Sequence, residues 1–140
     1  MMRKLLAAII LVLLPPALSA EIAWKHYKKA QKDAGEFLDI RVTDVSLDWC
    51  LVCSKRDVRV RAKVLKVHRT AAGIKVGNTI LIKYKTWTRR PRGWAGPRPI
   101  PILKEGQTYP AFLRRLSVNK KDGIICGPAA RGYSFQVLKK

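Results

Sequence analysis

The chain has 140 residues, a length that suits one domain with a modest core rather than several domains. Its 29 Lys and Arg residues against nine Asp and Glu residues give a formal net charge of +20 at pH 7. A surface this positive attracts polyanions and raises their local concentration, although net charge alone points to no specific site.

Residues 1–20 have the features of a secretory signal peptide. Arg3 and Lys4 form a basic start, Leu5–Leu14 is apolar, and Ala17–Ala20 is rich in the small residues that suit cleavage. The apolar run is shorter than the roughly 20 residues that span a bilayer, so a cleaved signal is favoured over a retained anchor. We expect an exported protein, periplasmic or extracellular, whose single mature domain spans residues 21–140 and carries a formal charge of +18 after the loss of Arg3 and Lys4.

The first expected element of the mature chain is a helix over Glu21–Phe37. Apolar residues recur from Ala23 to Phe37 at steps of four and three, which places them on one helical face. Because alanines make up most of this thin face, packing on the domain is favoured over lying on a membrane surface. Trp24 lies off the face and fits either an edge contact or an exposed aromatic residue.

The clearest strand pattern runs from Asp57 to Trp87. Apolar and basic residues alternate over Val58–Val64, the period of a strand with one buried face. The alternation shifts by one at Val64–Leu65, which predicts a β-bulge and a bent strand. Turn residues fill positions 71–78, and Thr79–Trp87 alternates again. This stretch therefore predicts two paired antiparallel strands of a small barrel.

The other strand patterns are shorter or less regular. They lie at Leu38–Trp49, from Gly106 to about Val118, at Ile124–Cys126 and at Tyr133–Val137. The first of these has its own phase shift between Val42 and Val45, which also indicates a bulge. Five or six short strands with one N-terminal helix predict a mainly β fold, a small Greek-key barrel of the oligonucleotide/oligosaccharide-binding (OB) type.

Three segments resemble the netrin-like and metalloproteinase-inhibitor (TIMP-like) barrels. They are Val60–Val67 as a long first strand, Gly73–Ile80 as a Val-Gly-Asn turn into the second, and Leu103–Leu113 as a Gly-x-x-Tyr entry into a Phe-Leu strand. The resemblance covers about residues 57–116 and implies the scaffold alone. Inhibitors of that family chelate zinc through a mature N-terminal cysteine, whereas this mature chain would begin at Glu21 and has its first cysteine at Cys50.

The three cysteines permit several readings. Trp49-Cys50-Leu51-Val52-Cys53 resembles the redox motif of thioredoxin-like proteins, but such a motif should open a helix, and here a charged turn and a strand follow. A zinc site formed by the cysteines with His68 or His26 is disfavoured in an oxidising compartment. We therefore expect no metal and no cofactor. The favoured reading is one structural disulfide and one spare thiol, with the partner of Cys126 open between Cys50, Cys53 and none.

The residues around position 90 are the best candidates for ligand binding. Trp87 and Trp94 bracket a proline-rich segment that holds four arginines: Arg89, Arg90, Arg92 and Arg98. Guanidinium groups pair with phosphate or carboxylate, and indoles stack or insert, although both tryptophans equally fit a role in covering the core. The outward positions of the adjacent strand extend this patch through Arg59, Arg61 and Lys63.

The sequence predicts no catalytic site. It contains no close carboxylate pair, Gly-rich phosphate loop, nucleophile elbow or His-Glu-x-x-His motif. The favoured function is a non-enzymatic exported domain that binds an anionic polymer or surface, such as an envelope polyanion, anionic lipid head groups or nucleic acid. The alternatives are a thiol–disulfide redox protein that uses Cys50 and Cys53, and a protein–protein interaction module of the cell envelope.

Overall fold

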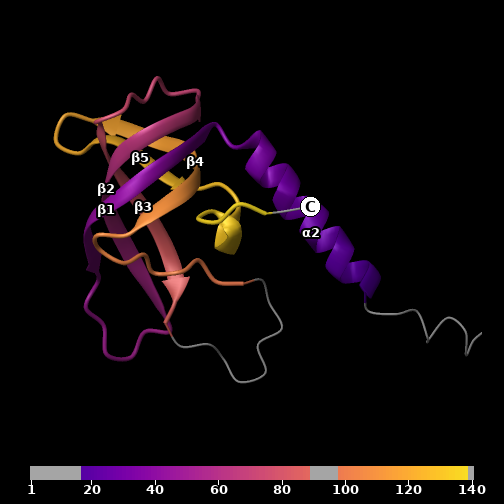
Figure 1. The fold of residues 1–140 in the computed structure, drawn as a ribbon. Helices are drawn as coiled ribbons and strands as arrows, with labels where there is room; N and C mark the ends of the chain where they lie inside the picture. Colours follow the sequence, from indigo (N-terminus) through magenta and orange to yellow (C-terminus); the bar gives the residue numbers. More distant parts are fainter. Residues whose placement is uncertain (1–16, 89–97, 139–140) are drawn as a thin grey trace, which may run out of the picture.

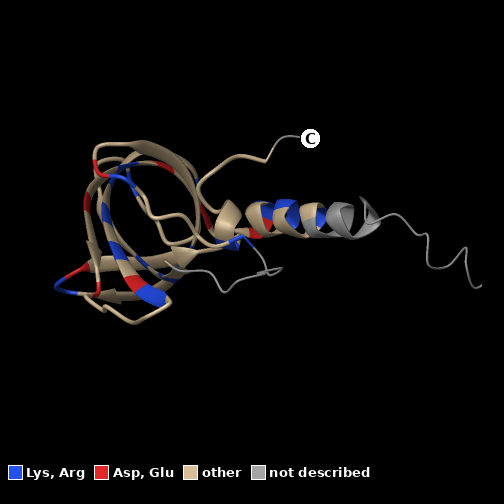
Figure 2. Ribbon diagram, turned by 90° about the horizontal axis from the view of Figure 1, so that it is seen from below, with Lys and Arg blue, Asp and Glu red and all other residues tan. Residues whose placement is uncertain are grey.

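The computed structural model describes residues 17–88 and 98–138, and these form a closed five-stranded barrel with one N-terminal helix (Figure 1). The elements are α2 (Ala17–Asp33), β1 (Glu36–Leu47), β2 (Lys55–Thr70), β3 (Thr79–Trp87), β4 (Thr108–Asn119), β5 (Gly123–Pro128) and the 3-10 helix η1 (Arg131–Tyr133). The strand order is β1-β2-β3-β5-β4, closed by pairing of β4 with β1. Seen end-on, the strands form a ring from which α2 projects (Figure 2). The mainly β, OB-like barrel predicted from the sequence is confirmed, with five strands.

Both predicted phase shifts correspond to bulges where β1 pairs with β2. On β2, Leu65 is skipped between the pairs Asp39↔Lys66 and Ile40↔Val64. On β1, Thr43 is skipped between Val42↔Ala62 and Asp44↔Arg61. A further shift lies between Phe37 and Leu38. Because each bulge adds a residue to one strand only, the two strands bend and coil enough to close the ring.

The barrel interior is filled by the alternating apolar residues of the three long paired strands. The fully buried set includes Leu38, Ile40, Val42, Val58, Val60, Ala62, Val64, Ile80 and Ile82. Tyr84 continues this inward row toward the end of β3, where its hydroxyl donates to the Pro101 carbonyl at 2.8 Å. Burial raises the pKa of Tyr84 to about 12. The segment around Pro101 thus closes that end of the barrel.

The helix ends earlier than the sequence pattern indicates. It stops at Asp33, and Phe37 instead lies in β1, where its ring stacks on Phe112 at 4.2 Å and on His68 at 4.3 Å. Gly35 interrupts the helix, and the flat ring finds more contact area on the sheet than a helix end offers. No helix within the described ranges is long and apolar enough to cross a membrane. Residues 1–16 of the predicted signal peptide lie outside those ranges, and α2 already begins at Ala17.

The face of α2 that meets the rest of the protein includes Tyr27 of the predicted face, which Ala34 continues just after the helix, and Gln31 adds to it. Tyr27 packs on Tyr133 with 4.6 Å between ring centroids, and the Trp24 ring meets Tyr133 edge-on at 6.2 Å. Gln31 is buried, and its Nε2 donates to the carbonyls of Tyr133 and Gln136, both at 2.7 Å. The helix therefore packs on the C-terminal segment through aromatic and amide contacts. Trp24 is an edge contact, one of its two predicted roles.

The last predicted strand, Tyr133–Val137, is wrong. The chain forms η1 there and then continues without regular structure. Ser134 explains the difference, because its hydroxyl accepts from the Ala130 N–H at 2.9 Å and donates to the Arg131 carbonyl at 2.7 Å, which stabilises a tight turn. Phe135 still reaches the core and packs near Tyr84. Alternation alone could not distinguish this turn from a strand.

A buried carboxylate at the start of β1 stabilises the β2–β3 connection. Glu36 is 1% exposed, and its Oε1 accepts from the backbone N–H groups of Ala71 at 3.1 Å and Ala72 at 2.7 Å. We predict that Glu36→Ala lowers the free energy of unfolding by about 1–3 kcal/mol, because the partly buried Ala72 N–H loses its acceptor, whereas the Ala71 N–H keeps the Gly35 carbonyl at 3.0 Å. Glu36→Gln keeps an oxygen acceptor and should lose less. Equal denaturation midpoints for wild type and Glu36→Ala would refute this role.

Candidate anion-binding site

The candidate site lies at the end of the barrel where β2 begins and β3 ends. The antiparallel register places Lys55 opposite Trp87, and the Thr88 N–H donates to the Ser54 carbonyl at 2.9 Å. After the undescribed residues 89–97, the chain runs beside β3 from Arg98 to Pro101. There the Thr86 hydroxyl donates to the Ile100 carbonyl, and Tyr84 donates to that of Pro101. Two strands and one returning segment therefore enclose this end.

These segments enclose a pocket of about 380 Å³ whose charged lining residues are all basic. We call it the cationic pocket, and it is lined by Lys55, Lys85, Thr86, Trp87, Arg98, Pro99, Ile100 and Arg131. The four basic residues come from β2, β3, the returning segment and η1. Because the fold brings together four cations that are distant in sequence, the pocket concentrates positive potential at one place.

Two of the four cations of the pocket lie over aromatic rings. The Lys55 ammonium lies 4.6 Å from the centroid of the Trp87 ring, and the Arg98 guanidinium lies 5.4 Å from that of Tyr133. The Lys85 Nζ is 3.9 Å from a carboxylate oxygen of Asp57, and both side chains are largely exposed. Such a long exposed pair contributes little. The pocket therefore keeps most of its positive charge available for an anion.

The close approach of two backbone segments beneath the pocket requires a glycine. A Cβ at Gly132 would lie 2.4 Å from the Arg98 carbonyl oxygen and 3.0 Å from that of Pro99. Only a residue without a side chain lets η1 approach the returning segment this closely. This contact positions Arg98 and Arg131 on the same pocket.

We predict that Gly132→Ala lowers the free energy of unfolding by about 1–3 kcal/mol, because two backbone segments must separate to admit the methyl group. Gly35→Ala is the matched control, since its new Cβ would meet the Ala71 Cβ at an ordinary 3.6 Å. Chemical denaturation of the two variants measures the difference. If both variants lose the same stability, η1 does not pack as closely on Arg98 as described.

The sequence-predicted binding residues are only partly brought together. Trp87 and Arg98 both line the cationic pocket. Arg59 lines a neighbouring hollow of about 330 Å³ with Asp48, Asp57, Val58, Lys83, Tyr84 and Lys85. Lys63 is exposed on β2, away from the pocket. The predicted residues Arg89, Arg90, Arg92 and Trp94 lie outside the described residues.

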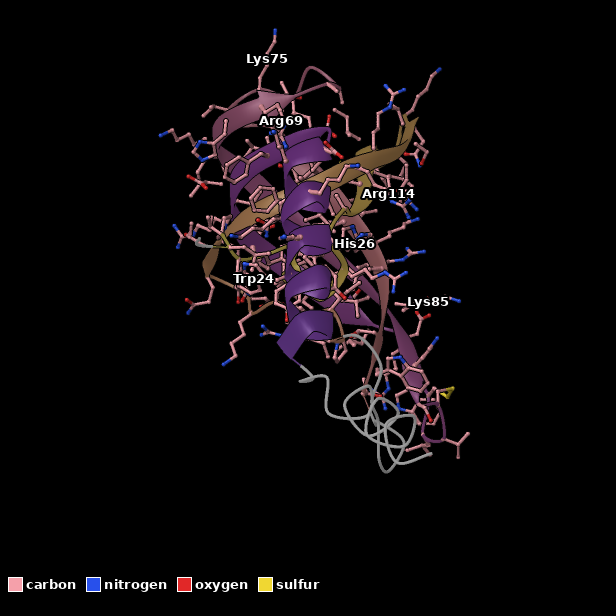
Figure 3. The ribbon with its side chains drawn as sticks, turned by 90° about the vertical axis from the view of Figure 1, so that its right-hand side faces the viewer. Trp24, His26, Arg69, Lys75, Lys85 and Arg114 are labelled. Atoms are coloured by element: carbon pink, nitrogen blue, oxygen red, sulfur yellow. A yellow bond between two sulfur atoms is a disulfide. The ribbon has the colours of Figure 1, made fainter. Side chains whose placement is uncertain are left out.

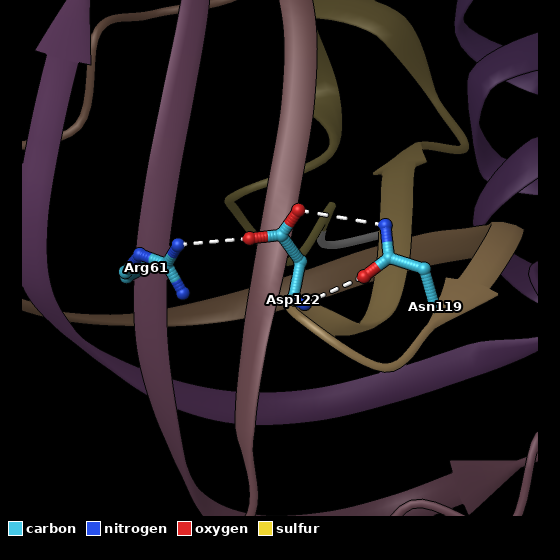
Figure 4. A network of polar contacts seen from close by, with 3 residues as sticks. All are labelled: Arg61, Asn119 and Asp122. Atoms are coloured by element: carbon cyan, nitrogen blue, oxygen red, sulfur yellow. Dashed lines mark hydrogen bonds and ion pairs between the residues drawn. The ribbon is translucent and has the colours of Figure 1, made fainter.

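Arg61 has a structural partner. Its Nη2 lies 3.0 Å from Oδ1 of Asp122, whose backbone N–H and Oδ2 both bond to Asn119 (Figure 4). The hydrogen bond from Arg61 holds the pKa of the Asp122 carboxyl below its ordinary value. This network joins the middle of β2 to the β4–β5 turn, so much of the charge of Arg61 is already paired.

Lys55, Lys85 and Arg131 were missed by the sequence reasoning. Lys55 and Lys85 could have been found from the sequence, because both occupy outward positions in their strands. Pairing those two strands would have placed both residues near Trp87. Arg131 carried no such signal, since its position follows from the unpredicted turn that precedes Ser134.

The cysteine pairing that the sequence left open is Cys50 with Cys53. Their Cα atoms are 5.5 Å apart, in the loop between β1 and β2, and the Cys50 carbonyl accepts a 2.7 Å hydrogen bond from the Arg56 guanidinium. The bridge follows a strand and precedes a strand, so no helix N-terminus faces Cys50. Within residues 17–88 and 98–138, no three His, Cys, Asp or Glu side chains are grouped to hold a metal ion. His68 instead pairs with Asp39 at 3.1 Å.

Cys126 is a buried free thiol in β5. Desolvation raises the pKa of Cys126 to about 12, so at neutral pH the side chain is a neutral thiol without nucleophilic thiolate. We predict that a thiol reagent at mildly alkaline pH labels no cysteine in the folded, non-reduced protein and one cysteine after unfolding. Peptide mapping without reduction should show Cys50 joined to Cys53. A bridge that includes Cys126, or rapid labelling of the folded protein, would contradict this assignment.

Comparison of the chain with protein-family models, with curated proteins and with solved structures gives no match.

Proposed function

We propose that this protein is a non-enzymatic binding domain for an anionic polymer or surface and that the cationic pocket is its principal contact. The observation that supports this most strongly is the convergence of Lys55, Lys85, Arg98 and Arg131 on one pocket with no carboxylate in its lining. Like charges repel, so such a cluster lowers the stability of the isolated fold. A bound anion would remove that repulsion.

The chemistry of the lining fits phosphate, sulfate or carboxylate groups. Guanidinium groups form paired hydrogen bonds with such oxyanions, and ammonium groups act as flexible point charges. Trp87 and Arg98, which both line the pocket, lie on either side of the undescribed residues 89–97 in the sequence. The sequence of that segment contains Arg89, Arg90 and Arg92. An extended polyanion, with many charges in a row, suits such a surface better than a small molecule.

Two features of the sequence complete this proposal. The signal-like residues 1–20 support export, so the natural ligands would be envelope polymers, anionic head groups or extracellular nucleic acid. The segments Val60–Val67, Gly73–Ile80 and Leu103–Leu113 support a netrin-like or TIMP-like version of the observed barrel. In that version only the scaffold is shared, because the N-terminal zinc-chelating cysteine is missing.

A thiol–disulfide redox role is the second candidate, supported by the surface position of the Cys50–Cys53 bridge. Redox-active pairs of this spacing have a first thiolate stabilised by a helix N-terminus, and this loop lies between two strands. A depressed pKa of the reduced Cys50 thiol and turnover of a disulfide substrate, abolished by Cys50→Ser, would favour this candidate over simple binding.

The test of the proposed site compares a variant that loses three charges from the pocket with a control that loses three charges elsewhere. We predict that Lys55→Gln/Lys85→Gln/Arg131→Gln binds heparin and single-stranded DNA at least tenfold more weakly at low salt. Each phosphate contact with single-stranded DNA releases about 0.7 counterions when it forms. The loss of three contacts should therefore reduce the magnitude of the slope of log K against log salt by about two.

The control is Lys75→Gln/Lys104→Gln/Lys121→Gln, which loses the same three charges from exposed positions that do not line the cationic pocket. It should bind nearly as well as the wild type. If the two triple variants weaken binding equally, the interaction depends on net charge alone and the proposed site is wrong.

A further inference from the structure

The loop between β1 and β2 exposes three large apolar side chains. Trp49, Leu51 and Val52 are 84%, 68% and 89% exposed, and we call them the apolar tip. The sequence analysis placed Trp49 at the end of a strand, but β1 ends at Leu47 and Trp49 lies beyond the core. The disulfide beside the tip lies at the lower periphery of the molecule, past Lys85 (Figure 3). Contiguous exposed apolar residues of this size mark an interaction site more often than chance exposure.

The tip is held in place by its own loop. The Cys50–Cys53 bridge closes it, the Arg56 guanidinium donates to the Cys50 carbonyl at 2.7 Å, and the Asp48 N–H donates to the Asp57 carbonyl at 3.1 Å. These contacts bind the loop to the end of the β1–β2 pair. The backbone of the loop is therefore constrained before a partner binds, which lowers the ordering cost of binding.

The tip adjoins the cationic pocket. A hollow of about 370 Å³ on its flank is lined by Asp48, Trp49, Cys50, Cys53, Lys55, Arg56, Asp57 and Lys85. Lys55 and Lys85 also line the cationic pocket, so they join the two features. Of the two carboxylates in this hollow, Asp57 lies 3.9 Å from Lys85 and Asp48 is exposed beside the tip. Counting both features, five basic residues surround two acidic ones.

We propose that the apolar tip inserts into the interfacial layer of an anionic lipid bilayer while the cationic pocket binds the lipid phosphates. This inference rests on the proposed function and names its anionic surface as a membrane. A small apolar anchor alone gives marginal membrane binding, and a second, electrostatic signal is needed for stable attachment. Lys and Arg residues near an anionic leaflet supply that electrostatic signal, and this end of the barrel has both signals.

The shape of the tip favours a lipid occupant over a protein. A stable protein interface buries about 800 Å² on each partner, usually over a broad complementary surface. Three side chains on a projecting loop offer far less than that. Tryptophan beside aliphatic residues is also the composition that prefers the head-group region, where the indole N–H remains hydrated while the ring is buried.

The experiment compares a tip variant with a control that loses two exposed aliphatic side chains elsewhere, on two probes. The tip variant is Leu51→Ser/Val52→Ser, and the control is Val76→Ser/Val118→Ser, which removes two valines that are 64% and 59% exposed elsewhere. The probes are vesicles of phosphatidylglycerol mixed with phosphatidylcholine, and heparin. We expect the tip variant to bind the vesicles about tenfold more weakly and heparin unchanged, whereas the control matches wild type on both.

Quenching of tryptophan fluorescence gives an independent readout. Spin-labelled lipids in the same vesicles should quench part of the emission of the wild type, and Trp49→Phe should remove most of that quenching while preserving binding. Quenching that persists in Trp49→Phe would show that another tryptophan enters the lipid and would overturn the assignment of the tip.

The outcomes separate the two proposals. If wild type binds neither probe, the proposed function fails and this inference fails with it. Heparin binding without vesicle binding, or vesicle binding equal in the wild type and the tip variant, would overturn the inference and leave the proposed function standing. If a folded tip variant binds neither the vesicles nor heparin, the tip is part of a general polyanion site, and the lipid assignment is also overturned.

Discussion

The pairing of β2 with both β1 and β3 is the constraint on which the rest of the structure depends. Every second residue of β2 from Val58 to Val64 enters the core, so the basic residues between them must face outward. The same pairing sets the register that places Lys55 against Trp87 and determines where the β1–β2 loop projects. The core, the cationic pocket and the apolar tip therefore follow from one hydrogen-bonded ribbon.

This dependence explains why the two surface features share one end of the barrel. The loop that bears Trp49 leads into Lys55 at the start of β2, and β3 returns beside it to end at Trp87. The chain then comes back through Arg98, where Gly132 permits the close approach of η1. Clustered cations repel one another and lower the stability of an isolated domain. Exposed apolar residues make such a domain prone to association. Their juxtaposition is most simply explained by a partner that is both anionic and apolar.

Much of the barrel could be predicted because β2 and β3 satisfy several local rules at once. Alternation, turn residues and the phase shift at Leu65 all agreed, and the observed bulge is the physical form of that shift. Residues 133–137 were mispredicted because the local hydrogen bonds of Ser134 compete with a strand and leave no trace in the alternation. The end of the helix was missed because Phe37 fits a helical face as well as a sheet, and only the tertiary stacking on Phe112 decides between them.

The candidate site was less predictable than the fold. Trp87 and Arg98 were identified from composition alone, whereas Arg131 reaches the pocket through a turn that only the three-dimensional structure defines. The exposure of Trp49 was also not evident, since an aromatic residue after an alternating strand is expected to continue its buried face. Sites assembled from distant segments depend on loop geometry, which periodicity does not encode.

Hydrogen–deuterium exchange with and without anionic vesicles tests most directly whether this end of the barrel is the binding face. We expect slower exchange in peptides that cover residues 48–56, 85–88 and 98–101, and unchanged exchange in the β2–β3 loop at residues 71–78, which follows the other end of β2. Protection concentrated in residues 71–78, or spread evenly over all basic segments, would contradict this expectation.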